Sequence, residues 1–257
     1  MDKSVVRTSG IALAIIERIA FSDEPMSQAE IAAEIGMVKS AAHKHLFTLE
    51  EASWVMRNSA TGRYVLGPKA WLVGQSAHYV ADLAATATPL MRAVRQQTGL
   101  AVVISAMEGR SLSVIAALPG THPIEIGVRR GSRLPLHASA QGQVALAFGA
   151  PELIETVCAR KLEALTPRTI TRPGALRTRV DETKRRGYGA APEETLLGIN
   201  VLAAPVFGRG GALAATVALV GSIQHLKEDP DPANVSAITI LARDISSARG
   251  FEAEANA

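Results

Sequence analysis

The stretch from residue 27 to residue 67 constrains the fold of this chain more than any other. Ser27 and Glu30 have the S-x-x-E spacing of a capping box, in which each side chain accepts a hydrogen bond from a backbone N–H of the first helical turn. Apolar residues at helical spacing follow from Ile31, and Gly36 supplies the left-handed residue that ends a helix. The pattern predicts a short capped helix followed by a tight turn.

A second amphipathic helix is predicted to start near Val38. At about 100° per residue, Ala42, His45, Leu46 and Leu49 fall on one stripe, and polar side chains face away from it. The combination matches a helix-turn-helix, whose second helix enters the major groove of DNA with its N-terminal part. His45 is interpreted as a half-buried core residue. The candidate DNA-contacting residues of this helix are Lys39, Ser40, Ala41, His43 and Lys44.

Two short β-prone runs, residues 54–57 and 63–66, flank a polar turn that contains Gly62. They predict a hairpin that serves as a wing beside the second helix. Arg57 and Arg63 would then contact phosphate or reach into the minor groove. The alternative is an ordinary helical subdomain with solvated cations, and the hairpin with its two arginines makes that alternative the weaker one.

The charge of the chain restricts how it can hold DNA. The formal net charge is only +3, and residues 1–68 carry seven Lys or Arg against eight Asp or Glu. A protein that binds nucleic acid through bulk positive charge is therefore excluded. Any DNA contact must be local, and the cations of this region do cluster after residue 38.

These motifs together resemble the winged helix of IclR-type bacterial transcriptional regulators. The resemblance is carried by V-K-S-A-A-H-K at residues 38–44, by T-L-E at residues 48–50 and by T-G-R-Y-V-L-G at residues 61–67. The family often has Pro, Thr and Leu where this chain has Val38, Ala41 and His45. The resemblance implies operator DNA as a partner, but it does not carry over an operator sequence.

The remainder of the chain is long enough for a second domain, since 257 residues exceed one small DNA-binding module. An alanine-rich stretch predicts a linker helix, and Thr88-Pro89 offers the cap and first proline of a further helix. Short β-prone runs then alternate with helical segments, which predicts an α+β domain with a largely antiparallel sheet. The expected divisions are a DNA-binding domain at 1–68, a linker helix at 69–87 and a further domain at 88–257.

The second domain also resembles IclR-type regulators. G-S-R-L-P-L-H-A-S-A-Q-G-Q at residues 131–143, R-G-Y at 186–188 and G-I-N-V-L-A-A-P-V at 198–206 carry the likeness. It implies a GAF-like effector-binding fold that encloses a small molecule. Carried over position by position, the resemblance implies a pocket lined by Leu134, Leu136, His137, Ala138, Ser139, Ala140, Gln141, Gly142, Ile199, Val201, Ala218 and Val220.

The side chains at three of these positions indicate the class of effector. Family members that bind small oxo or hydroxy acids tend to carry Cys or Ser where this chain has Val201, Ala218 and Val220. An unpaired polar ligand group buried there would cost about 1 to 3 kcal/mol. The sequence therefore predicts a small organic acid with an aromatic or otherwise apolar body. His137 is expected to donate to its carboxylate or to cap the adjacent helix, and the same apolar residues are compatible with plain core packing.

Enzyme chemistry finds little support in the sequence. It contains no P-loop, no dinucleotide-binding glycine motif, no G-x-S-x-G and no H-E-x-x-H. The six histidines and the single cysteine, Cys158, lack metal-ligand spacing, so no metal or cofactor is expected. A Ser139–His137 pair remains the one catalytic arrangement left open.

The sequence as a whole predicts a ligand-responsive transcriptional regulator, a repressor or an activator of a catabolic operon. Its expected partners are double-stranded operator DNA, a small effector, a second or several further copies of itself as a homodimer or homotetramer, and RNA polymerase. Without a signal-peptide pattern or a long apolar run, it is expected to be cytoplasmic and free of membrane. The alternatives are a small-molecule enzyme with an accessory winged helix and a protein-interaction module.

Overall fold

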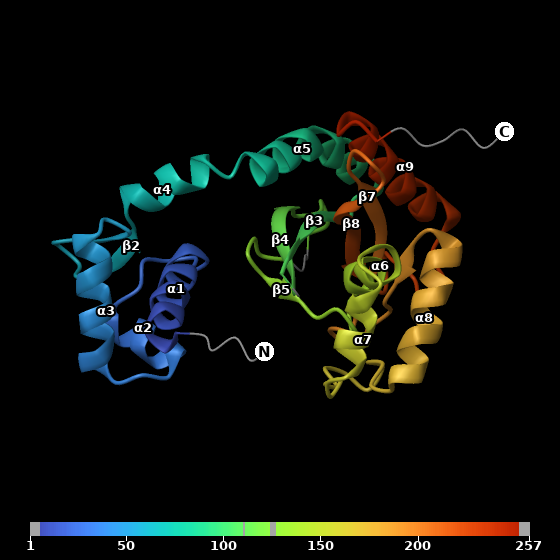
Figure 1. Cartoon of the computed structure of the whole chain (residues 1–257). Coiled ribbons are helices and arrows are strands. Elements are labelled where there is room, and N and C mark those ends of the chain that lie inside the picture. Colours follow the sequence, from blue (N-terminus) through green and yellow to red (C-terminus); the bar gives the residue numbers. More distant parts are fainter. Residues whose placement is uncertain (1–5, 110, 124–126, 252–257) are drawn as a thin grey trace. The chain divides into compact units, whose positions relative to one another are not determined.

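The computed structural model describes residues 6–109, 111–123 and 127–251. The chain divides into two compact units, with the boundary between Ala81 and Asp82 (Figure 1). Each unit has a hydrophobic core of its own.

The first unit is a helical bundle with a two-stranded hairpin (Figure 1). Ile15, Ile31 and Leu46 are fully buried at its centre. Tyr64 of the hairpin also bridges to Met26, which ties the wing to the helices. The predicted winged helix-turn-helix is confirmed, and its elements are α1 (Arg7–Ala20), α2 (Gln28–Ile35), α3 (Lys39–Glu51), β1 (Val55–Arg57) and β2 (Tyr64–Leu66). A further helix, α4 (Pro68–Gln75), follows in the same unit.

The turn between α2 and α3 forms as its sequence predicts. The Ser27 hydroxyl accepts from the N–H of Glu30 at 3.3 Å, and the Glu30 carboxylate accepts from the N–H of Ser27 at 2.7 Å. Gly36 ends α2 with φ of +70°, a conformation that costs other residues more than glycine. The N–H of Gly36 and of Met37 then bond back into α2. The turn is therefore fixed by local interactions alone.

The second unit is built on one six-stranded antiparallel sheet in the order β5-β4-β3-β8-β7-β6. The sheet confirms the predicted mixed α and β class. Its strands are β3 (Ala101–Glu108), β4 (Ser111–Leu118), β5 (Arg133–Leu134), β6 (Gly189–Ala190), β7 (Ile199–Phe207) and β8 (Leu213–Ser222).

Helices cover both faces of this sheet (Figure 1). On one face, α5 (His78–Thr98) and α9 (Pro232–Ala248) pack through side chains such as Met91 and Ile245 onto Leu219 and its neighbours. On the other face, α6 (Ala140–Phe148) packs through Ala140 and Val144 onto β7 and β8. Alternate residues of each strand therefore serve two different cores. The remaining helices, α7 (Glu152–Cys158) and α8 (Pro173–Arg186), follow α6 in the chain.

The prediction for the linker is wrong in its details. The structure has two helices there, α4 and α5, which are separated at Ser76 and Ala77, and α5 runs on through Thr88 and Pro89 instead of starting there. The Thr88 hydroxyl donates to the carbonyl of Ala84, as it does inside a helix. Leu83, Ala87 and Met91 are fully buried along one side of α5, so packing on the sheet outweighs the hydrogen bond that proline removes.

Candidate functional site

The recognition-type helix α3 has the two faces that its sequence predicts. Ala42, Leu46 and Leu49 are buried against the other helices, and His45 is half-buried beside them. Of the five candidate contact residues, Lys39, Ser40, His43 and Lys44 are exposed, and Ala41 is half-buried on the flank of the same face. The structure thus brings all five to the outer side of α3.

The N-terminus of α3 is open in a way that the N-terminus of α2 is not. Val38 at the N-cap position supplies no side-chain cap, and the first turn of α3 contains no acidic residue. The first backbone N–H groups of a helix carry partial positive charge and bind phosphate well. An anion can therefore bind to the backbone of Lys39 and Ser40 as well as to their side chains. The candidate list of side chains does not include this backbone site. An apolar residue at the N-cap position, Val38, is the sequence feature that indicates it.

Phe47 was also overlooked as a candidate. Its side chain is 57% exposed and lies one turn after Lys44 on the outer side of α3. An exposed aromatic side chain on such a helix is suited to contact the methyl group of thymine in the major groove. The same helical periodicity that selected Lys44 places Phe47 on this side.

The wing holds Arg57 at the surface. Asn58 closes the turn by accepting, through Oδ1, the N–H groups of Ala60 and Thr61. Arg57 Nε donates to the carbonyl of Gly62 at 3.3 Å, and its guanidinium lies 5.9 Å from the centre of the Tyr64 ring. The side chain stays exposed, so it is held in place without being buried.

Arg63 lies differently from the sequence-based expectation of a phosphate contact. Its Nη1 donates to the carbonyl of Pro25 at 2.7 Å and to Glu30 at 3.0 Å, and its Nη2 reaches the same carboxylate at 3.4 Å. Hydrogen bonds from Ser27 and the charge of Arg63 lower the pKa of Glu30 below its usual value. Arg63 therefore ties the wing to the capped start of α2, and a DNA contact would first have to break these bonds.

In the second unit, four of the candidate effector residues lie on one face of the central strands. Ile199 and Val201 of β7 and Val220 of β8 belong to one apolar cluster with Val103 of β3, and Ala218 lies on the same face beneath α6. We call this surface the α6 face of the sheet. Apart from Ser105 and Thr216 near one end, the strand residues that point to it are largely apolar.

The α6 face is not fully covered at its centre. Val201, the third residue of β7, is half-buried, with Val220 opposite it on β8 and the N–H of Ala191 bonded to its carbonyl on the other side. Leu134 of β5 packs against the same apolar cluster. The α6 face is therefore apolar and less than fully buried at this point.

The start of α6 is held to the sheet by its polar side chains. Ser139 caps the helix by accepting from the N–H of Gly142 at 3.0 Å, and its hydroxyl donates to the carbonyl of Pro135. The Nε2 of Gln141 lies 3.1 Å from the hydroxyls of Ser105 and Thr216. A side chain at Gly142 would meet the carbonyl oxygen of Leu136 at 2.4 Å, so this position accepts only glycine. The buried Ala138 and Ala140 complete this tightly packed segment.

Leu136 and His137 point to a different place. Leu136 is buried with side chains of α7 and α8, and both residues line a cavity that also borders α7. His137 Nε2 lies 2.9 Å from the carbonyl oxygen of Glu163, and the cap of α6 is Ser139. Because His137 and Ser139 each bond to a separate backbone carbonyl, they do not form a nucleophile–base pair. The structure thus divides the predicted pocket residues between two places.

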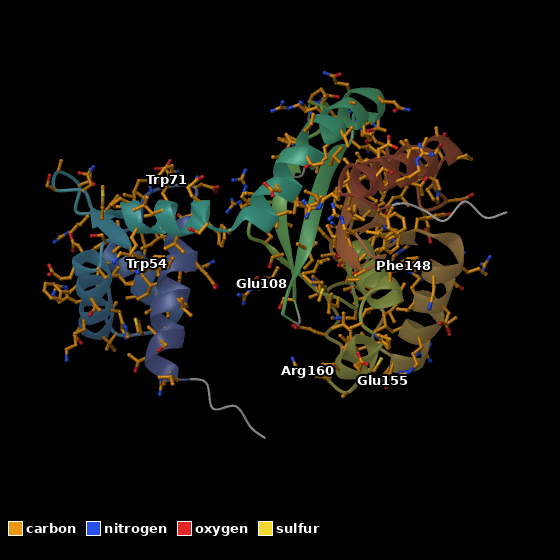
Figure 2. The ribbon with its side chains drawn as sticks, turned by 45° about the horizontal axis from the view of Figure 1, so that its top comes forward. Trp54, Trp71, Glu108, Phe148, Glu155 and Arg160 are labelled. Carbon is orange, nitrogen blue, oxygen red and sulfur yellow. The ribbon has the colours of Figure 1, made fainter. Side chains whose placement is uncertain are left out.

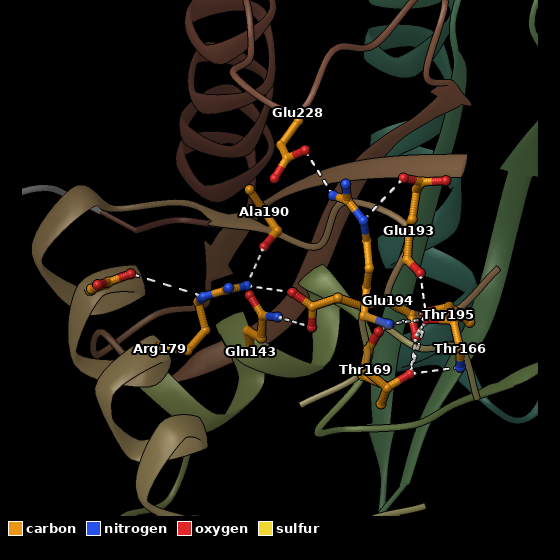
Figure 3. A network of polar contacts seen from close by, with 12 residues as sticks. Gln143, Thr166, Thr169, Arg179, Ala190, Glu193, Glu194, Thr195 and Glu228 are labelled. Atoms are coloured by element: carbon orange, nitrogen blue, oxygen red, sulfur yellow. Dashed lines mark hydrogen bonds and ion pairs between the residues drawn. The ribbon is translucent and has the colours of Figure 1, made fainter. Parts of the chain in front are cut away.

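A buried ionic network fixes the segment that leads into β7 (Figure 3). Glu194 is 2% exposed, accepts from Arg179 Nη1 at 2.5 Å and accepts from Gln143 Nε2 of α6 at 3.2 Å. The hydroxyls of Thr166 and Thr169 donate to the carbonyls of Glu193 and Glu194. Burial raises the pKa of Glu194, and Arg179 and Gln143 oppose that rise. The network joins α6, α8 and the start of β7 beside the α6 face.

The described ranges contain neither a metal-binding cluster nor a membrane-spanning helix. No group of three or more His, Cys, Asp or Glu side chains there is arranged to hold a metal ion. No helix in the same ranges is long and apolar enough to cross a membrane.

Comparison with known proteins gives a consistent assignment. Models of the IclR helix-turn-helix domain and of the C-terminal region of the bacterial transcriptional regulator IclR match residues 10–59 and 75–247. The chain is 28% identical over 220 residues to the transcriptional repressor IclR of Escherichia coli, which covers 84% of this chain and 80% of that protein. It is 27% identical over 237 residues to the glycerol operon regulatory protein of Streptomyces coelicolor, covering 91% and 93% of the two chains.

A solved structure shares the whole fold. An IclR homologue from Microbacterium hydrocarbonoxydans, crystallised in complex with 4-hydroxybenzoate, superposes with a TM-score of 0.80 over 93% of this chain and 98% of its own, at 23% sequence identity. The named curated relatives are regulators of transcription and not enzymes.

Proposed function

Because the chain belongs to the IclR family of bacterial transcriptional regulators, we propose that it controls a catabolic operon in response to a small organic acid with an aromatic or apolar body. That the chain is a ligand-responsive, DNA-binding regulator follows from the family. The observation that carries the finer proposal is the apolar α6 face, where Val201 is half-buried and Ala218 and Val220 are buried beside it. As a regulator of bacterial DNA, it would act in the cytoplasm.

The proposed DNA contacts lie on α3 and the wing. Ser40, His43 and Lys44 are exposed where the helix would face base edges, with Ala41 on the flank. Lys39 and the uncapped backbone at the start of α3 would hold a phosphate. Arg57 would contact the backbone or the minor groove from the wing, whereas Arg63 would act by holding the wing to α2.

We propose that the regulator binds its operator as a homodimer or as a tetramer of such dimers. One recognition helix reads too few base pairs to select a genomic site, and two related helices on a pseudopalindrome multiply the discrimination. Helix α4 supports a contact between copies, because none of its residues is buried and Trp71, Leu72 and Val73 are 65%, 59% and 51% exposed (Figure 2). An exposed run of this size is suited to an interface. RNA polymerase is proposed as a further partner of the DNA-bound form.

The effector is proposed to bind at the α6 face between Leu134 and the side chains of β7 and β8. The face supplies apolar contacts for the body of the acid, and the N-terminal turn of α6 offers partial positive charge to its carboxylate. The same fold holds 4-hydroxybenzoate in the Microbacterium protein, which supports an aromatic acid as the first compound to test. The effector would change DNA affinity through its different affinity for two states of the protein.

Isothermal titration calorimetry of the whole chain tests this proposal. Benzoate and 4-hydroxybenzoate serve as aromatic acids, and glyoxylate serves as a small polar acid without an apolar body. We expect an aromatic acid to bind at least about tenfold more tightly than glyoxylate, since burying the ring gains about 25 cal/mol per Å² of apolar surface. Tighter binding of glyoxylate would rule out the apolar-effector proposal but would leave the role in transcription intact.

A further inference from the structure

A second cavity lies on the other side of the loop that precedes α6. It has a volume of about 520 Å³, within the range of small-molecule sites, and it is bordered by the loop from Arg133 to His137 and by α7 with the segment that follows it. No residue of β7 or β8 lines it. Leu134 borders both this cavity and the proposed effector site on the α6 face, and the other residues named for the two sites differ.

The floor of this cavity is apolar. Leu136 and Leu162 are buried there, and Leu153 and Val157 of α7 pack in the same cluster. Leu165 borders the cavity with 43% of its surface exposed. A ligand with an apolar body would remove these side chains from water, which is favourable in proportion to the area covered.

The rim of the cavity is cationic. Arg133, Arg160 and Lys161 line it, and none of the described residues that line it is acidic. Arg160, which is labelled in Figure 2, and Lys161 follow Ala159, the C-cap residue of α7. Both are exposed, and neither forms an ion pair within the described part of the chain. Their two full charges outweigh the partial negative charge of about half a unit that a helix C-terminus carries.

Several neighbouring arginines are held in ion pairs. Arg177 binds Glu155 at 2.7 Å, Arg179 binds Glu194, and Arg168 binds both Glu193 and Glu228. Arg133 itself lies 3.7 Å from Glu108. Arg160 and Lys161 form no such pair within the described residues, so they can attract an anion from solution.

We propose that this cavity is a second ligand site, which binds an organic anion by placing its apolar body on the leucine floor and its charge beside Arg160 and Lys161. The proposal does not depend on the effector proposed for the α6 face, because Arg160, Lys161 and Val157, on which its test acts, are not part of that face and the test contains neither DNA nor effector.

The test uses a pair of fluorescent probes that differ only in charge. 8-Anilinonaphthalene-1-sulfonate has an apolar body and a sulfonate, and N-phenyl-1-naphthylamine is the same body without the sulfonate. Both are titrated into the whole wild-type chain and into the double variant Arg160→Gln, Lys161→Gln. We expect the variant to bind the sulfonate about 3- to 10-fold more weakly at low salt and to bind the neutral probe unchanged, as partly exposed ion pairs allow.

A matched control separates a local contact from the general effect of net charge. Lys184→Gln, Arg185→Gln removes the same charge from the exposed last turn of α8 and should leave the binding of both probes unchanged. A loss of sulfonate affinity that is equal in the two double variants, or absent from both, would overturn the proposal.

A second variant tests the floor. Val157→Trp places a large side chain in the cavity and is expected to lower the affinity for both probes by at least about fivefold. Circular dichroism checks that the variant is folded. Unchanged binding of both probes to folded Val157→Trp would place them elsewhere and overturn the proposal. The charge comparison stands independently if this variant does not fold.

Discussion

At the scale of single residues, Lys44 is the sharpest test of the DNA interface. Its side chain is exposed on the outer side of α3 and is not part of an ion pair within the described residues. Lys44→Ala is expected to weaken operator binding by about 1 to 3 kcal/mol if the lysine reads a base, or to make the salt dependence shallower if it holds a phosphate. Fluorescence anisotropy at several salt concentrations measures both.

Lys227→Ala is the matched control for this measurement. It removes one exposed lysine from the second unit and should leave the affinity and the salt slope nearly unchanged. Wild-type affinity and slope in Lys44→Ala would remove this residue from the interface.

Val220 tests the apolar character of the α6 face. Val220→Ser replaces a side chain that is 6% exposed on this face, and we expect the affinity for an aromatic acid to fall about 5- to 30-fold, or about 1 to 2 kcal/mol. Val217→Ser is the control, because Val217 is fully buried on the opposite face of the same strand and should affect stability without affecting affinity. Calorimetry that shows tighter binding by Val220→Ser would contradict the proposed pocket.

At the scale of elements, the missing side-chain cap at the start of α3 is expected to lower the stability of the protein and to raise its affinity for DNA. Val38→Ser would provide the missing cap and stabilise the protein by about 0.5 to 1 kcal/mol in urea unfolding. The same hydroxyl would occupy a backbone N–H that a phosphate needs, so operator affinity should fall. Val38→Ala supplies no cap, so it should neither stabilise the protein nor lower its affinity for the operator. A Val38→Ser protein that binds DNA more tightly would show that this backbone does not contact phosphate.

The network around Glu194 gives the second unit a pH dependence of predictable sign. Since burial raises the pKa of Glu194, the folded state holds its proton to higher pH than the unfolded chain does. This residue therefore contributes most to stability below the ordinary glutamate pKa, and that contribution falls as pH rises through the raised value. In urea unfolding between about pH 4 and 7, Glu194→Gln should remove this part of the pH dependence. Glu163→Gln, an exposed control, should not, and an unchanged profile in Glu194→Gln would contradict the assignment.

Features that depend on contacts within a few residues could be predicted from the sequence, whereas features that depend on distant contacts could not. The capping box and Gly36 were predictable because every interacting group lies within a few residues. The faces of α3 followed from helical periodicity. The passage of α5 through Pro89 was not predictable, because it depends on burial of the helix against a sheet that forms from later residues.

The candidate sites divide in the same way. Arg63 was correctly placed on the wing, but its partner Glu30 lies 33 residues away, and no local pattern indicates that contact. The sequence motif from Leu134 to Gly142 predicted one pocket, whereas in the structure Leu134 of β5 borders both the α6 face and the cavity at α7, and Leu136 and His137 border that cavity. The segment after α7, which forms the cationic rim, carried no recognisable motif.

At the scale of the whole molecule, the exposed face of α4 predicts that the regulator depends on self-association. Trp71→Ala should raise the dissociation constant of the dimer at least about tenfold, because a large aromatic side chain at an interface often contributes more than 1.4 kcal/mol. Sedimentation velocity across a range of protein concentrations measures this change. Lys69→Ala, on the same helix, should leave it unaltered. A Trp71→Ala protein that sediments like the wild type at all concentrations would move the interface away from α4.

The position of Leu134 has a consequence for how the regulator responds to two ligands. Its side chain packs with the apolar cluster on the α6 face and also with the cluster that floors the second cavity. If a ligand at either place displaces Leu134, the two occupancies are linked, and thermodynamics requires each ligand to change the affinity of the other by the same factor. The transcriptional output would then report a combination of two metabolite concentrations, and the shape of its dose response to one compound would depend on the level of the other.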